Sequence, residues 1–227
     1  MTPSLLVVVL AGGEGRRMGG GKPLRLFRGR SLIAHALDRA RSWSPQVAVS
    51  VRSPDQVGPV AAPLVLDDPG VEGPLAGLSA ALLFARDQGL ERLLTLPCDM
   101  PGLPDDLARR LEQAVVPGAA VAIAMCAGRL HPVCAVWDVE VHASLSGYLA
   151  GGRSSVRGFG ETIGMKTVVW DDAYATAFEN FNTQAELSRA DGGVRNRRTG
   201  QCRLDRHGRG LERLLRQPAA AGGVPGA

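Results

Sequence analysis

Short, continuous apolar runs alternate along this chain with segments whose apolar residues recur at helical spacing. A short apolar run without polar alternation is typical of a strand buried on both faces, as in parallel sheets covered by helices. The alternation predicts an α/β fold: a three-layer, doubly wound, mostly parallel, Rossmann-like sheet. The expected strands are Leu5–Leu10, Val47–Val51, Leu64–Leu66, Leu93–Leu96, Ala120–Met125, Val133–Trp137 and Thr167–Trp170, and the expected helices are Leu32–Trp43, Ala76–Gln88, Pro104–Val115, Val139–Ala150 and Thr183–Ala190.

This pattern ends near residue 190 of the 227-residue chain. Residues 191–227 hold eight arginines against three acidic residues, a net charge of +5, whereas residues 1–190 carry −1. We expect one domain over residues 1–190, followed by a basic, disordered tail. A nucleic-acid-binding arm is the alternative interpretation of the tail. Because the tail lacks interleaved aromatic residues for base stacking, we do not expect nucleic acid as a partner.

The four cysteines form no CxxC pair and show no spacing typical of a zinc site. We expect them to be reduced and structural, which suits a cytoplasmic protein. No apolar run reaches the roughly 18 residues that a membrane-spanning helix needs, so we expect no membrane partner. The first apolar run is interpreted as a buried strand because a signal peptide would carry its basic residues before the run.

A glycine-rich loop follows the first expected strand. Residues 10–24 contain six glycines together with Arg16, Arg17 and Lys22. Free backbone N–H groups at the end of a buried strand suit phosphate oxygens, and the three cations strengthen that attraction. The loop therefore predicts a polyphosphate site, with a plain glycine-rich turn as the alternative.

Two familiar phosphate motifs do not match this loop. The Walker pattern requires a glycine where Arg16 stands and a hydroxyl residue where Pro23 stands. The dinucleotide pattern GxGxxG begins at Gly13 but has Met18 in its third glycine position. The loop therefore matches neither of these familiar phosphate-binding motifs.

Carboxylates end two further expected strands. Asp67 and Asp68 follow Leu64–Leu66, and either can accept hydrogen bonds from N1–H and N2–H₂ of a guanine; the alternative is a turn or helix cap. Asp99 follows Leu93–Leu96 in a proline-rich segment that fixes its backbone. A rigid carboxylate at a strand end suits Mg²⁺, with helix capping as the alternative.

Polar residues in the second half of the chain suggest a second substrate. Arg129, Arg153 and Arg157 are candidates for a clamp on an anionic group. Asn180 and Asn182 alternate along an extended stretch, so both should project from the same side. Thr183 and Glu186 have the spacing of a helix capping box. His131 is interpreted as a packed residue rather than a catalytic base.

Together these segments resemble the molybdenum cofactor guanylyltransferase (MobA) family, within the nucleotidyltransferases of GT-A-like fold. The resemblance extends over residues 5–189 and implies transfer of GMP from GTP to the phosphate of molybdopterin, with Mg²⁺ as cofactor and release of pyrophosphate. Proteins of cofactor insertion are implied as further partners. The matching motifs are LAGGEGRRMGGGKPL, GPLAGL, LPCDMPGLP, RLHPV with GGRSSVR downstream, and ENFNTQAEL.

The resemblance also implies a role for individual residues, with catalysis assigned to Arg17, Lys22 and Asp99. It assigns nucleotide binding to Leu10, Ala11, Gly12, Gly13, Lys22, Asp67, Gly77 and Asp99, pterin binding to Arg153, Asn180 and Asn182, and the metal to Asp99. One departure stands out, because Gly21 occupies a position where the family commonly has Asp. The alternatives are a related nucleotidyltransferase that uses CTP or a sugar or alcohol phosphate, and a non-catalytic nucleotide- or nucleic-acid-binding protein.

Overall fold

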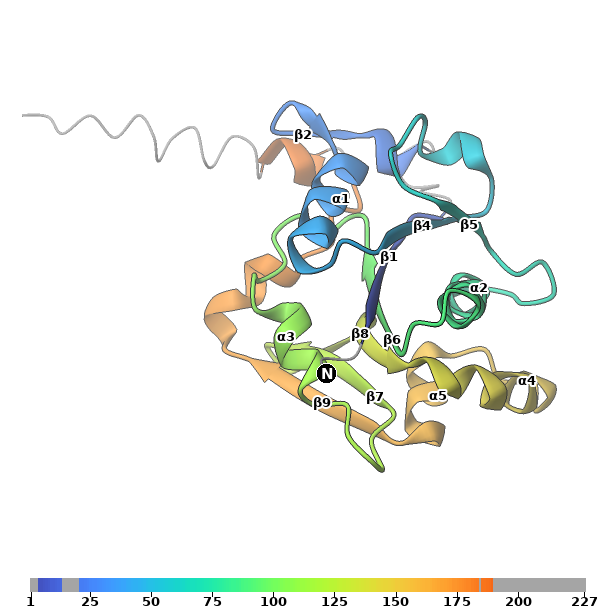
Figure 1. Ribbon diagram of the computed structural model, residues 1–227. Helices are drawn as coiled ribbons and strands as arrows, with labels where there is room; N and C mark the ends of the chain where they lie inside the picture. Colours follow the sequence, from blue (N-terminus) through green and yellow to red (C-terminus); the bar gives the residue numbers. More distant parts are fainter. Residues whose placement is uncertain (1–3, 14–20, 184, 190–227) are drawn as a thin grey trace, which may run out of the picture.

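The computed structural model describes residues 4–13, 21–183 and 185–189. Within these ranges the main sheet has seven strands in the order β5-β4-β1-β6-β8-β7-β9 (Figure 1). Strand β8 pairs antiparallel with β6 and β7, and every other pair in the sheet is parallel. The strands are β1 (Leu5–Leu10), β4 (Val47–Val51), β5 (Leu64–Leu66), β6 (Arg92–Pro97), β7 (Val121–Cys126), β8 (Arg129–Asp138) and β9 (Met165–Trp170).

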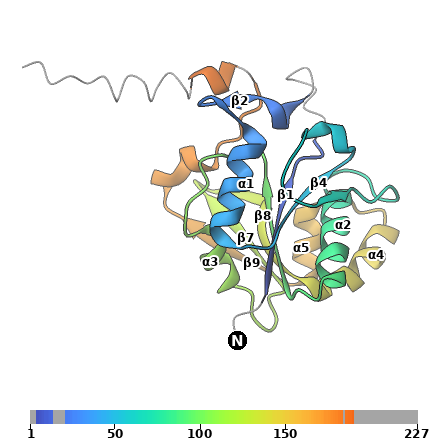
Figure 2. The same ribbon diagram turned by 45° about the horizontal axis from the view of Figure 1, so that its top comes forward.

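Helices cover both faces of this sheet, which confirms the predicted three-layer fold. Helices α1 (Leu32–Trp43) and α3 (Leu107–Glu112) lie on one face. Helices α2 (Pro74–Asp87), α4 (His142–Ala150) and α5 (Val156–Ile163) lie on the other (Figure 2). Alternate residues of β1 enter the two cores. The strand must therefore be apolar at every position, because it has no solvent-facing side.

Most expected elements are confirmed to within a few residues, with two differences in the helices. The expected helix Val139–Ala150 begins with a 3₁₀ turn, η4 (Val139–Val141), before α4. Helix α3 is shorter than expected. Residues 185–189 are helical, in agreement with the expected last helix as far as that helix is described.

The structure also contains elements that the sequence patterns did not predict. These are α5, the hairpin β2 (Leu26–Phe27) with β3 (Arg30–Ser31), and the 3₁₀ turns η2 (Lys22–Leu24), η3 (Pro54–Gln56) and η5 (Asp172–Phe178). Helix α5 contains Gly158 and Gly160, which lower its intrinsic helix propensity. At Gly160 a Cβ would lie 3.3 Å from Ile123 and 3.4 Å from Val121, so glycine allows the helix to pack closely on β7. Tertiary packing decides the conformation here.

Three predictions can be compared with the described residues only in part. Cys98, Cys126 and Cys134 are free and buried, as expected, while Cys202 lies outside the described residues. The predicted tail at 191–227 and Arg17 in the glycine loop also lie outside them. No helix of the described residues has the length and apolar character to cross a bilayer.

The register of the parallel strands brings their following residues to one edge of the sheet. Leu10 lies opposite Ser50 of β4 and opposite Pro97 of β6. Backbone hydrogen bonds continue beyond the strands, from Ala11 N to Ser50 O (2.8 Å) and from Asp67 N to Val51 O (2.8 Å). The loops that carry the candidate site residues therefore meet at the carboxyl ends of the strands.

Candidate functional site

A cavity of about 260 Å³, here called the strand-end pocket, opens at this edge of the sheet. It brings together every described residue that the resemblance assigned to the nucleotide. These residues come from the end of β1, from η2, from the residue after β5, from α2 and from the loop after β6. They are Leu10, Ala11, Gly12, Gly13, Lys22, Asp67, Gly77 and Asp99.

The carboxylate of Asp67 lies in a closely packed position at one end of the strand-end pocket, here called the Asp67 seat and formed by Ser50, Arg52, Gly12 and Gly77. Its Oδ1 accepts a hydrogen bond from Ser50 Oγ (2.7 Å), and Arg52 Nε lies 4.0 Å from Oδ2. A Cβ at Gly12 would lie 2.6 Å from Asp67 Oδ2, and one at Gly77 would lie 2.7 Å from Ser50 Oγ. Glycine at both positions therefore leaves the space that the carboxylate and its hydroxyl partner occupy.

The structure separates the two carboxylates that follow β5. Asp68 accepts hydrogen bonds from the backbone N–H of Gly70 (2.9 Å) and from Ser79 Oγ (3.0 Å). It thus stabilises the turn that leads into α2, which is the alternative that the sequence left open for it. Asp67 lines the strand-end pocket and Asp68 does not. Asp67 is therefore the better placed of the two to contact a bound base.

Lys22 and Asp99 form a mostly buried ion pair at the other end of the same pocket. Their side chains are 14% and 10% exposed. The ammonium of Lys22 also donates a hydrogen bond to Asn182 Oδ1 (2.9 Å), and Phe181 N donates to Asp99 O (3.1 Å). These contacts connect η2 and the end of β6 with the segment after η5. They join residues 160 positions apart in the sequence.

Gly21 and Cys98 directly precede the two residues of this ion pair in the sequence. Gly21 has a φ of +61°, a left-handed conformation that glycine adopts without strain, and it precedes η2 directly. Burial raises the pKa of the Cys98 thiol to about 12, with a further contribution from Asp99. Cys98 is therefore a neutral thiol near pH 7 and no nucleophile.

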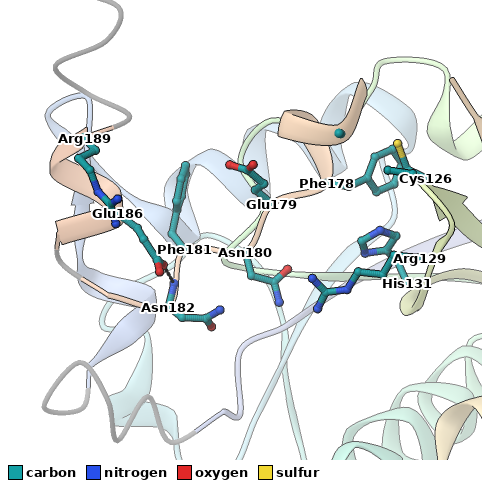
Figure 3. A pocket seen from close by; sticks show the side chains of 12 residues that line it. Cys126, Arg129, His131, Phe178, Glu179, Asn180, Phe181, Asn182, Glu186 and Arg189 are labelled. Carbon is teal, nitrogen blue, oxygen red and sulfur yellow. Dashed lines mark hydrogen bonds between the residues drawn. The ribbon is translucent and has the colours of Figure 1, made fainter. Parts of the chain in front are cut away.

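A second cavity of about 660 Å³, here called the side pocket, lies between β8 and the segment after η5 (Figure 3). Asn180 and Asn182 extend into it from the same side of the backbone, as their spacing predicts, while Phe181 extends to the opposite side. The Oδ1 atom of Asn180 is buried and has no hydrogen-bond partner among the described residues. An unpaired buried amide oxygen is costly, which suits a site where a ligand donates to it.

His131 contributes packing to the side pocket, as the sequence interpretation expects. It is buried, and its ring lies on that of Phe178 with 4.9 Å between the centroids. Burial lowers the pKa of His131, and the positive charge of Arg129 lowers it further. The imidazole is therefore predominantly neutral near pH 7.

The segment that carries Asn182 is fixed by the predicted capping box. Thr183 Oγ1 accepts from Glu186 N (3.2 Å), and a carboxylate oxygen of Glu186 accepts from Thr183 N (3.1 Å) and from Asn182 N (2.6 Å). The backbone hydrogen bond from Asn182 has the largest effect and lowers the pKa of Glu186. The box thus orients the backbone beside the Lys22 contact.

The three arginines proposed as a clamp do not gather at one place. Arg129 lines the side pocket. Arg153, at the turn between α4 and α5, stacks its guanidinium over the Tyr148 ring (4.3 Å), and Arg157 pairs with Glu161 along α5 (2.8 Å). The structure therefore joins Asn180 with Asn182 and does not place Arg153 beside them.

Two residues with polar side chains in the strand-end pocket were not identified from the sequence. Ser50 and Arg52 both line the strand-end pocket and face Asp67. Ser50 is the polar residue within the otherwise apolar strand β4, VAVSV. A buried hydroxyl at the end of a parallel strand is a signal that sequence reasoning can use, because the pairing with β1 brings it to the ligand edge.

A metal site in this pocket would rest on few protein ligands. In the ranges that the structure describes, no three His, Cys, Asp or Glu side chains gather as a metal cluster. Asp67 and Asp99 are the described carboxylates of the strand-end pocket, and Asp99 pairs with Lys22. Mg²⁺ binds through one or two carboxylates when substrate phosphates and water complete its coordination. The donor chemistry of Asp99 fits this type of site.

Comparison with known proteins identifies the family. The profile of the MobA-like NTP transferase domain matches residues 7–162. The chain belongs to the MobA-like nucleotidyltransferase family. It is 39% identical over 193 residues to the molybdenum cofactor guanylyltransferase of Acidiphilium cryptum, covering 83% of this chain and 95% of the relative. The corresponding protein of Cereibacter sphaeroides is 38% identical over 189 residues, covering 82% of this chain and 95% of the relative.

Solved structures share the fold of this chain. Molybdopterin-guanine dinucleotide biosynthesis protein A from Archaeoglobus fulgidus superimposes with a TM-score of 0.67 at 22% identity, covering 84% of this chain and 98% of that protein. A CMP:2-keto-3-deoxy-manno-octonic acid synthetase complexed with CTP gives 0.68 at 15% identity, covering 86% and 99%. These likenesses concern the fold, and they confirm the expected nucleotidyltransferase architecture.

Proposed function

We propose that this chain is a molybdenum cofactor guanylyltransferase, which transfers GMP from GTP to the phosphate of molybdopterin and releases pyrophosphate. Relatives with this name match more than four fifths of the chain. The observation that carries the proposal is the strand-end pocket, which has a seated carboxylate at one end and a lysine–carboxylate pair at the other. It adjoins a larger pocket with two asparagines, where a second substrate has room.

The base would bind at the Asp67 end. Guanine presents N1–H and N2–H₂ as adjacent donors, and a carboxylate accepts from both. Cytosine presents a different edge, so the Asp67 seat favours GTP over CTP. Gly12 leaves room for this carboxylate, because a Cβ there would lie 2.6 Å from Asp67 Oδ2.

The phosphates would lie between Lys22 and the glycine loop. Lys22, and Arg17 by family resemblance, would stabilise charge on the α-phosphate and on the departing pyrophosphate. Asp99 would hold Mg²⁺, which supplies further charge stabilisation and alignment. The attacking phosphate of molybdopterin is already ionised near pH 7, so the reaction requires no general base. A buried, neutral His131 agrees with that expectation.

The second substrate would enter the side pocket. Asn180 offers a buried, unpartnered amide oxygen to donor groups, and Asn182 reaches Lys22 at the boundary between the two pockets. Arg129 adds positive charge on the same side. Buried free thiols also support a cytoplasmic location, where proteins of cofactor insertion would receive the product.

The decisive experiment mixes the full-length protein with Mg²⁺, molybdopterin and one nucleoside triphosphate, and measures pyrophosphate release. We expect release with GTP, and much less with CTP or ATP. Asp99→Ala should abolish Mg²⁺-dependent turnover, whereas Asp105→Ala, which removes an exposed carboxylate beside Arg39, should leave it intact. Equal rates with GTP and CTP would contradict the assignment of guanine.

A further inference from the structure

Lys22 lies at the boundary between the two pockets and contacts a residue of each. Its ammonium donates to Asp99 Oδ2, and both residues line the strand-end pocket. The same ammonium donates to Oδ1 of Asn182, which lines the side pocket (2.9 Å). With an exposed fraction of 14% for the lysine and 10% for the aspartate, water screens this pair weakly.

We propose that the Lys22 ammonium occupies the cation position at Asp99 in the free protein, so that a divalent metal binds there only after a triphosphate has drawn Lys22 away. This inference rests on the proposed function, since it assigns an order of binding to that site. An ammonium and a divalent cation on one carboxylate repel each other strongly in a poorly screened pocket. Triphosphate oxygens offer Lys22 an alternative partner of higher negative charge.

Asn182 makes this exchange relevant to the second substrate. Its amide oxygen accepts the hydrogen bond that holds Lys22 next to Asp99. When Lys22 moves to the phosphates, that oxygen is released at the edge of the side pocket. The order that follows is nucleotide first, metal with the nucleotide, and the second substrate last.

The test measures binding of Mn²⁺ alone to the nucleotide-free, full-length protein by electron paramagnetic resonance. Wild type should bind Mn²⁺ weakly. Lys22→Met, which removes the competing cation, should bind Mn²⁺ about tenfold more tightly, the effect of one lost charge-assisted contact. Lys22→Gln provides a second neutral variant, and Lys22→Arg, which keeps the charge, should show no gain.

Two controls separate local competition from a general loss of positive charge. Arg129→Met removes one charge from the side pocket without touching Asp99 and should change Mn²⁺ affinity less than about twofold, because solvent and salt screen its charge. Adding Asp99→Asn to Lys22→Met should abolish the gain. Circular dichroism and thermal unfolding establish that each variant is folded.

The outcomes distinguish this inference from the proposed function. Calorimetry with GTP is performed on the same wild-type preparation. Equal Mn²⁺ affinity in wild type and the two neutral Lys22 variants, with GTP still bound by wild type, overturns the inference alone. Absence of GTP binding to wild type overturns the proposed function. A gain that survives Asp99→Asn also overturns the inference, because the metal would then bind elsewhere.

Discussion

Ser50 shows how a residue without direct chemistry can prepare a binding site. Its hydroxyl donates to Asp67 Oδ1 at 2.7 Å, and it lies 1% exposed at the end of β4. The hydrogen bond fixes one carboxylate oxygen and leaves Oδ2 directed toward Gly12 and Arg52. Orientation of a charged acceptor before binding reduces the free-energy cost of ordering it afterwards.

At this residue we predict that Ser50→Ala weakens GTP binding at least about tenfold, because a lost hydrogen bond to a charged group costs about 1.5–3 kcal/mol. ITP lacks the 2-amino donor, so its affinity should fall less, and the preference for GTP over ITP should shrink. Calorimetric titration of both nucleotides measures the ratio. Ser42→Ala on the exposed face of α1 is the control. An equal loss for both nucleotides would indicate general damage to the pocket instead.

The pKa of Glu186 tests whether its carboxylate accepts hydrogen bonds from the backbone beside Asn182. The N–H of Asn182, followed by that of Thr183, lowers the pKa of Glu186 below its ordinary value. A lowered carboxyl pKa means that the capping contribution is present above the ordinary pKa and is lost as the pH falls through the lowered value. We predict that the backbone amide resonance of Asn182 titrates with a midpoint below the ordinary pKa of a glutamate side chain. Glu186→Gln should remove this titration, and a midpoint at or above that ordinary pKa would contradict the geometry.

Among the secondary-structure elements, α2 carries a conflict between intrinsic propensity and packing. Alanine is favoured over glycine by up to about 1 kcal/mol in a helix interior. At Gly77, however, a Cβ would lie 2.7 Å from Ser50 Oγ and 3.2 Å from Asp67 Oδ1. Such overpacking costs roughly 1–3 kcal/mol, so packing should outweigh propensity.

We therefore predict that Gly77→Ala lowers the free energy of unfolding and weakens GTP binding, because it displaces the Asp67 seat. Gly147 in α4 is the matched control, since it is exposed and a Cβ there would meet no described atom within 4 Å. Gly147→Ala should stabilise the protein by roughly 0.5–1 kcal/mol. Urea denaturation of both variants measures whether the free energy of unfolding falls in Gly77→Ala and rises in Gly147→Ala. A stabilised Gly77→Ala protein with normal GTP affinity would refute the steric argument.

The elements also indicate what the sequence could and could not predict. Strand β1 and helix α1 follow from local hydrophobic patterns, and their predicted bounds are confirmed. Helix α5 was not predicted because its glycines serve close packing, Gly160 on β7 and Gly158 against Tyr148 of α4. The nucleotide-side residues were found because they follow strands, whereas the contact between Lys22 and Asn182 depends on how distant segments meet. Arg153 illustrates the same limit, since nothing local predicts its stacking on Tyr148.

On the scale of the whole molecule, the two pockets meet where Lys22 of one contacts Asn182 of the other. The strand-end pocket lies mainly at the ends of the parallel strands, with Val133 of β8 in its lining, and the side pocket lies between β8 and the segment after η5. That segment is anchored by Leu187, which is 1% exposed and packs with Phe27 and Leu32. The helical residues 185–189 thus pack against the β2–β3 hairpin and the start of α1.

This anchoring predicts where the chain can be shortened. A chain ending at residue 190 keeps Asn182 and Leu187, and it should retain pyrophosphate release from GTP within about twofold of full length, because the described pockets lie entirely within it. A chain ending at residue 180 loses both residues and should lose activity and thermal stability together.

Truncation at 190 also changes the net charge from +4 to −1. The alternative role of the tail, nucleic-acid binding, is tested by fluorescence anisotropy with duplex DNA at low and high salt. If the full-length chain binds DNA in a salt-sensitive way, the chain ending at residue 190 does not, and both are equally active, residues 191–227 serve nucleic-acid binding.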